Sequence, residues 1–120
     1  MEPSILITIK KMLGLDQDYD VFDEEIKVHI NSVFMYLNQL GVGPDTPFSI
    51  TGDTETWPQF TPNGDNANAL KTYMYLRVKL VFDPPNTSFV LKAIQDQITE
   101  LEWRLNVQVE PQGDPNVKRI

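Results

Sequence analysis

The strongest constraint on this chain is Asp83-Pro84-Pro85, a stop signal between two long stretches of helical periodicity. Neither proline can donate a helix hydrogen bond, and Pro84 disfavours helical geometry at Asp83. The preceding pattern predicts a helix over residues 66–82, and the following pattern predicts one over residues 86–109. The 66–82 segment is apolar around more than half of its circumference, so we expect it to be the central helix.

The predicted 86–109 helix carries two separate sets of hydrophobic residues. One set recurs at spacings of 3 and 4 and forms a core-facing stripe: Leu91, Ile94, Ile98, Leu101 and Leu105. Phe89, Trp103 and Val107 fall on the opposite side of the helix. A helix with a complete core stripe and a second apolar patch has two surfaces to bury. This pattern indicates assembly rather than catalysis.

A second long helix repeats the two-sided pattern. We expect it to begin at Asp20 or Asp23 and to end at Gly41, with first-turn acids favoured by the helix dipole. Its core stripe has helical spacing throughout: Phe22, Ile26, Ile30, Val33, Leu37 and Leu40. Val28 and Met35 lie on the far side of this helix, seven residues apart.

Shorter signals place the remaining segments. Ser4 can cap a short first helix that runs to about Leu13 and is ended by Gly14. Between residues 42 and 65, closely spaced Gly, Pro, Asn and Asp residues predict a long irregular loop. We interpret it as a contact loop with one capped helical turn, held by its large apolar side chains: Phe48, Ile50, Trp57 and Phe60.

These elements define the expected fold class. It is an all-α, small helical bundle of about four helices, with a long irregular loop between the second and third long segments. Residues 1–109 form a single helical domain, and residues 110–120 form an extended C-terminal arm, because its Pro and Gly residues cannot continue the last helix.

Composition narrows the possible classes of function. A length of 120 residues with 41% hydrophobic content suits one folded domain. The absence of cysteine removes disulfides and thiolate chemistry, and agrees with cytosolic synthesis. A net charge of −7 counts against DNA binding, which depends on Lys and Arg neutralising phosphates. No apolar run approaches the length of a membrane span, so no membrane partner is expected.

The residue clusters that could form a metal or catalytic site lack residues that such a site requires. Alternate aspartates between residues 16 and 20 resemble the start of a calcium loop, but Val21 replaces its glycine and Lys27 its bidentate glutamate. The single histidine, His29, has no second histidine or cysteine with which to hold a metal. We therefore expect no catalytic residue, no cofactor and no metal site.

Arg77 lies within the apolar arc of the central helix, where a buried arginine needs a carboxylate or several carbonyl partners. An internal ion pair, or a stem that extends its charged end to the rim, is favoured over an ion pair between subunits, and these readings stay open. The candidate oligomer or partner interface combines this arginine, the loop tryptophan and the off-stripe apolar residues: Val28, Met35, Trp57, Arg77, Phe89, Trp103 and Val107.

Three segments follow one another in a distinctive order. The first contains His29-Ile30-Asn31-Ser32-Val33-Phe34, the second runs from Tyr73 to Pro85, and the third is Glu100-Leu101-Glu102-Trp103-Arg104-Leu105-Asn106. With the short first helix, this order resembles the small head–tail connector (adaptor) proteins of long-tailed bacteriophages. The resemblance covers residues 4–109, and its motifs are structural rather than chemical.

The resemblance implies an all-α structural subunit of the virion neck, assembled in the host cytoplasm. It implies a homo-oligomeric ring of twelve beneath the portal protein, joined below to a head-completion (stopper) or tail protein. Double-stranded DNA would pass non-specifically through the ring. Two-sided helices suit a ring, which needs two different contact surfaces on each subunit. An acidic balance suits a DNA channel if acids line it, because like charge discourages sticking.

The alternative is a small all-α regulatory or DNA-binding interaction module. A helix-turn-helix needs clustered basic residues on a helix that follows a short joint. The one short joint in this sequence is Asp83-Pro84-Pro85, and the next helix opens with Phe89-Val90-Leu91 instead. Absence of a DNA mobility shift at low salt would remove this alternative.

Overall fold

The computed structural model describes residues 4–61 and 67–109. These residues form five helices and no strand: α1 (Ile5–Met12), α2 (Asp23–Gln39), α3 (Trp57–Phe60), α4 (Ala67–Phe82) and α5 (Ser88–Val109). The predicted all-α class is confirmed, with four longer helices and a single helical turn, α3, inside the loop. The predicted arm, residues 110–120, lies outside the described residues.

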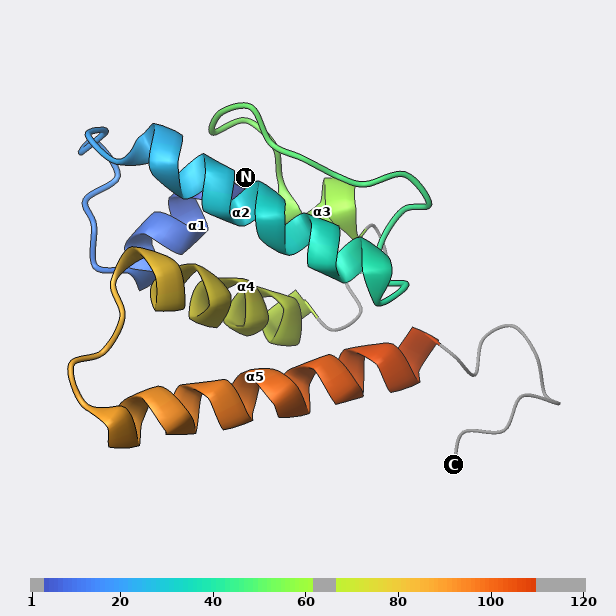
Figure 1. Ribbon diagram of the computed structural model, residues 1–120. Coiled ribbons are helices and arrows are strands. Elements are labelled where there is room, and N and C mark those ends of the chain that lie inside the picture. The colour runs from blue at the N-terminus through green and yellow to red at the C-terminus, as the bar shows by residue number, and fades with distance from the viewer. Residues whose placement is uncertain (1–3, 62–66, 110–120) are drawn as a thin grey trace, which may run out of the picture.

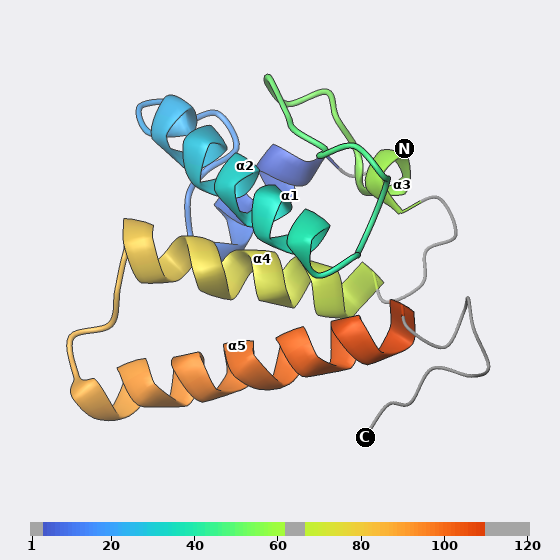
Figure 2. The ribbon, with the colours of Figure 1, turned by 45° about the vertical axis from the view of Figure 1, so that its right-hand side comes forward.

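The helices are arranged in layers around α4. α2 and α5 pack on different sides of α4, and α1 contacts both α2 and α4 (Figures 1 and 2). α2 and α5 run in the same direction, and α4 returns between them. The prediction that the 66–82 helix is central is therefore confirmed, because α4 contributes to every main packing contact between the longer helices except that of α1 with α2.

The helix ends follow the capping signals in the sequence. Ser4 Oγ accepts a hydrogen bond from the Ile7 N–H at 3.3 Å, which caps α1. Thr87 Oγ1 accepts from the Val90 N–H at 3.3 Å and caps α5. Gly14 and Gly41, which follow α1 and α2, have φ values of +86° and +84°. Glycine reaches this left-handed region without a Cβ clash, so it ends both helices cleanly.

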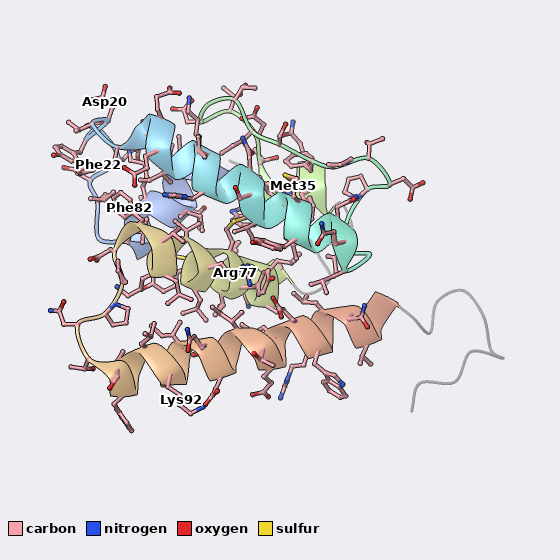
Figure 3. All side chains as sticks on the ribbon, in the orientation of Figure 1. Asp20, Phe22, Met35, Arg77, Phe82 and Lys92 are labelled. Carbon is pink, nitrogen blue, oxygen red and sulfur yellow. The ribbon has the colours of Figure 1, made fainter. Side chains whose placement is uncertain are left out.

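Most residues of the two predicted stripes are buried in the core. On α2, Ile26, Ile30, Val33 and Leu37 are buried, and on α5 the buried stripe residues are Ile94, Ile98 and Leu105. Phe22 is a correction, because it lies outside the core and packs edge-on against Phe82 with ring centroids 5.2 Å apart (Figure 3). Phe34 is fully buried although it lies outside the predicted stripe.

Phe34 is buried because the loop folds back over α2. Its ring lies 5.0 Å from that of Phe48 and 4.8 Å from that of Phe60. Asn31 fixes the loop further, since its side chain accepts from the Ile50 N–H at 2.8 Å and donates to the Ile50 carbonyl at 3.0 Å. The prediction that apolar side chains hold the loop is confirmed for its described part, and its role as a contact loop stays a prediction.

Lys10 is a buried charge that ties α1 to the start of α2. Its Nζ lies 2.9 Å from Asp23 Oδ1 and donates to the Gln17 carbonyl at 2.9 Å. A buried ammonium is stable only when it is paired and hydrogen-bonded. The contact therefore fixes the acidic segment between the two helices against the bundle.

Candidate functional site

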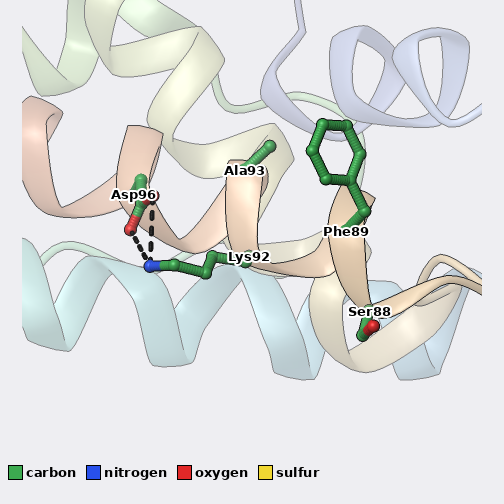
Figure 4. Close-up of a pocket in the computed structure, with 5 residues that line it drawn as sticks. All are labelled: Ser88, Phe89, Lys92, Ala93 and Asp96. Carbon is green, nitrogen blue, oxygen red and sulfur yellow. Dashed lines mark hydrogen bonds and ion pairs between the residues drawn. The ribbon is translucent and has the colours of Figure 1, made fainter.

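The side of α5 that faces away from α4 is the most exposed apolar surface described. Phe89 is 83% exposed and Trp103 is 67% exposed, whereas Leu105, two residues further on, is buried. Between the two aromatic residues, Lys92 and Asp96 form an exposed ion pair at 3.2 Å (Figure 4). We call this surface the α5 face: Phe89, Lys92, Asp96 and Trp103.

The α5 face is hollowed near its N-terminal end. A depression of about 590 Å³ is lined there by five residues: Ser88, Phe89, Lys92, Ala93 and Asp96 (Figure 4). α5 contacts the bundle mainly through α4, so no other described helix covers this side. Aromatic residues are enriched in protein–protein interfaces, so the exposed Phe89 beside this depression is a candidate contact for a partner protein.

A second apolar surface lies on α2, which we call the α2 face: Val28, Met35 and Tyr36. Val28 is 62% exposed and Met35 is 59% exposed. Tyr36 marks the edge of this face, where α2 approaches α4 across a groove of about 210 Å³. His29, Arg77 and Val81 are among the residues that line the groove.

Arg77 connects three helices at the bottom of this groove. Its Nη1 lies 3.0 Å from Glu102 Oε2 on α5, and its guanidinium carbon lies 3.9 Å from the centre of the Tyr36 ring on α2 (Figure 3). Tyr73 Oη donates to the same Glu102 oxygen at 2.8 Å. Burial, reinforced by this hydrogen bond to a carboxylate, raises the pKa of Tyr73 above its usual value.

The comparisons with known proteins agree with a chain built for assembly. Residues 5–112 match the family model described as phage connector protein. This chain belongs to that family. The match includes all five helices, and a structural connecting role in the phage particle follows from it. Neither the curated proteins nor the solved structures gave a match.

The connector places its predicted interface residues in five different environments. Phe89 and Trp103 lie on the α5 face, and Val28 and Met35 lie on the α2 face. Val107 is half-buried near the end of α5. The remaining two residues, Trp57 and Arg77, are not on either face.

Trp57 requires a correction. It is 3% exposed and its Nε1 donates to Thr8 Oγ1 at 3.2 Å, so it fastens the loop to α1 inside the subunit. Arg77 forms the internal pair with Glu102, which confirms the favoured reading over an ion pair between subunits. Arg77 acts on the two faces indirectly, because it links α2 and α5, the helices that carry them.

Sequence reasoning missed Tyr36 and the Lys92–Asp96 pair as parts of the two faces. Tyr36 lies seven residues after His29 on the edge of the α2 stripe, and this spacing was the available signal. Lys92 and Asp96 have the i, i+4 spacing of a helical ion pair. Such pairs are frequent on exposed helices, so the spacing alone gave no reason to assign them a role.

The described surfaces of the connector are suited to contacts with other proteins. Among residues 4–61 and 67–109, no group of three His, Cys, Asp or Glu side chains is placed to hold a metal ion. Within the same ranges, no helix combines the length and apolarity needed to cross a membrane. What the two faces present is exposed apolar area next to charged pairs, which is the composition of a protein–protein interface.

Proposed function

We propose that this connector is a non-catalytic neck protein that forms a ring beneath the portal, joins it to a head-completion (stopper) or tail protein, and continues the DNA channel. The observation that carries the proposal is the placement of two exposed apolar faces on opposite layers of the bundle (Figure 1). A ring needs two different complementary surfaces on each subunit, and the two exposed faces are the surfaces that we propose for it.

The family match supports the same function independently of those faces. Phage connector proteins are structural components of the particle, and the match runs from α1 through α5. The net charge of −7 suits a channel for DNA if acidic residues line it, because like charge repels the phosphate backbone. We propose that the ring surrounds the DNA without binding it specifically.

Electron microscopy of the protein mixed with the portal protein of the same phage tests this function. The expected result is a closed ring seated on one end of the portal, with a central opening. The isolated subunit is expected to stay monomeric until it meets the portal. Failure to form a ring or to bind the portal under any assembly condition would overturn the proposal.

A further inference from the structure

We infer that the ring contact joins the α5 face of one subunit to the α2 face of the next, with these two helices parallel. The inference rests on the proposed ring and specifies its interface. The partner that covers both faces is a second copy of this chain.

The layer order determines which surfaces can meet. α2 and α5 lie in the outer layers and run in the same direction, with α4 between them (Figures 1 and 2). In a ring of many subunits, each copy is related to its neighbour by a small rotation, and the two meet through different surfaces. A small rotation preserves helix direction. α5 of one copy therefore lies alongside α2 of the next in the parallel sense.

When α2 and α5 of neighbouring copies start level with each other, Lys92 of the α5 face comes near the acidic first turn of α2, which precedes the α2 face. The first turn of α2 is acidic, and its Glu24 and Glu25 are exposed. Lys92 is exposed near the start of α5, pointing away from α4 (Figure 3). Its pairing with Asp96 is exposed and contributes little to stability, so Lys92 can also bridge to the acids of a neighbour.

The apolar parts of the two faces also match in this register. Residues 30–40 of α2 and its C-cap contain no charged side chain. They lie opposite the C-terminal half of α5, where Trp103 is exposed. Contact between Trp103 and the region around Met35 removes apolar area from water without burying an unpaired charge.

A symmetric contact between two α5 faces is less favourable. An antiparallel α5 pair that sets Phe89 against Trp103 puts Asp96 opposite its own copy, since Asp96 lies midway between them in the sequence. Two like charges held face to face repel each other. The contact between α5 and α2 avoids this repulsion.

Cysteine cross-linking tests the inference directly, because the natural chain contains no cysteine. Val28 and Ala93 are each the sixth residue of their helix, α2 and α5 respectively. Met35 and Glu100 are each the thirteenth residue. We would make two double variants whose cysteines stand at the same position along α2 and α5, called level pairs: Val28→Cys with Ala93→Cys, and Met35→Cys with Glu100→Cys. Each would be assembled with the portal before oxidation.

The crossed pair, Val28→Cys with Glu100→Cys, is the matched control. Its sites differ by seven positions along the helices, about 10 Å at 1.5 Å per residue. A disulfide requires Cα atoms within about 7 Å, so the crossed pair cannot close in the parallel register. The expected result is a ladder of covalent multimers from both level pairs and none from the crossed pair or from single cysteines.

The other outcomes separate this inference from the proposed ring. A ring in micrographs without cross-links from the level pairs would overturn the face assignment and leave the ring standing. Cross-linking by Ala93→Cys alone would reveal an α5–α5 contact, and cross-linking to the portal would assign the face to the portal; both overturn the inference. Absence of any ring or portal binding would overturn the ring and the inference together.

Discussion

Neighbouring residues of α5 have opposite roles because of the side of the helix they occupy. Trp103 is mostly in water, and Leu105 is buried against α4. A buried leucine contributes to the folding of a single subunit, whereas an exposed tryptophan contributes once another protein covers it. The two residues therefore separate the stability of the subunit from the stability of the assembly.

The substitution Trp103→Ala is expected to weaken ring assembly while it changes the subunit's free energy of unfolding by no more than about 0.5 kcal/mol. The control Leu105→Ala is expected to lower that free energy by about 2–5 kcal/mol, because it leaves a cavity in the core. Chemical denaturation of the subunit and the yield of rings on the portal measure the two effects. Equal loss of both for Trp103→Ala would place this side chain in the subunit core.

Arg77 shows how one side chain can join three elements. It bonds Glu102 on α5 and covers the Tyr36 ring on α2, and Tyr73 shares the Glu102 oxygen. Lysine could not replace it equivalently, because only the planar guanidinium can stack on a ring while it donates to a carboxylate. This network holds α2 and α5 in a definite relation across α4.

At the scale of elements, the long loop is a packed part of the bundle. Its described part is fastened by the Phe34, Phe48 and Phe60 rings and by the Asn31 hydrogen bonds to Ile50. Gly43 permits the close approach of the loop to this cluster, with a φ of +93°. A Cβ at this position would lie 2.5 Å from Phe60 Cε1, so both the backbone and the packing require glycine.

Gly43→Ala is therefore expected to destabilise the subunit more than Gly14→Ala. Both glycines have positive φ, +93° and +86°, so each alanine carries a left-handed strain of about 1–2 kcal/mol. A Cβ at Gly14 would meet nothing within 4 Å, whereas at Gly43 it would force the Phe60 ring to move. Urea denaturation compares them, and equal losses would contradict the role of the Phe60 contact.

The loop also contains a carboxylate that should make stability depend on pH. Burial opposes the ionisation of Glu55, but hydrogen bonds from Thr51 and Gly52 outweigh it and hold its pKa below the usual value of 4.5. A depressed pKa stabilises the folded state above the unfolded-state pKa, and this stabilisation disappears as pH falls through the folded-state pKa.

Glu55→Gln is expected to lower the melting temperature at pH 7, because the amide presents only one acceptor oxygen to the donors that Glu55 now holds: Thr51 N–H and Oγ1, and Gly52 N–H. The difference from the natural chain should shrink as pH falls below about 4.5, where the carboxylate itself becomes protonated. Thermal unfolding followed by circular dichroism over this pH range measures it. A difference that does not change with pH would argue against the hydrogen-bonded carboxylate.

At the scale of the whole molecule, the α2 face and the α5 face give each subunit two different binding surfaces, one for each neighbour in the ring. Met35→Asp should block the α2 face and leave the α5 face intact. Trp103→Asp should block the α5 face and leave the α2 face intact. Each variant alone would fail to form a ring, because a charge at the centre of an apolar contact is costly when it is buried without a partner. A mixture of the two retains one intact pair of complementary faces.

With the portal protein present, mixing the two variants is expected to give 1:1 pairs of the variants and no ring. Electron microscopy checks for the ring and chemical cross-linking gives the size of the variant complexes, with each variant alone as the control. Rings from either variant alone would show that its substituted face is not part of the contact. Complexes of more than two variant subunits from the mixture would show that at least one of the two substituted faces is not part of the contact.

The sequence by itself determined the helices, their ends and the presence of two apolar sides. Helical spacing, the Pro84-Pro85 stop and the capping residues are local, so they can be recognised without knowing what packs against what. The family could also be recognised from the sequence, because the segments that resemble it follow one another in the expected order along the chain.

The tertiary structure alone decided which apolar residues stay exposed and how the two faces are oriented. Trp57 and Trp103 look equally available in sequence, but the loop turns Trp57 into the core and α5 leaves Trp103 in water. Likewise Arg77 could have paired within or between subunits until α5 brought Glu102 within 3.0 Å. Burial depends on contacts between segments far apart in sequence, and these arise only when the chain has folded.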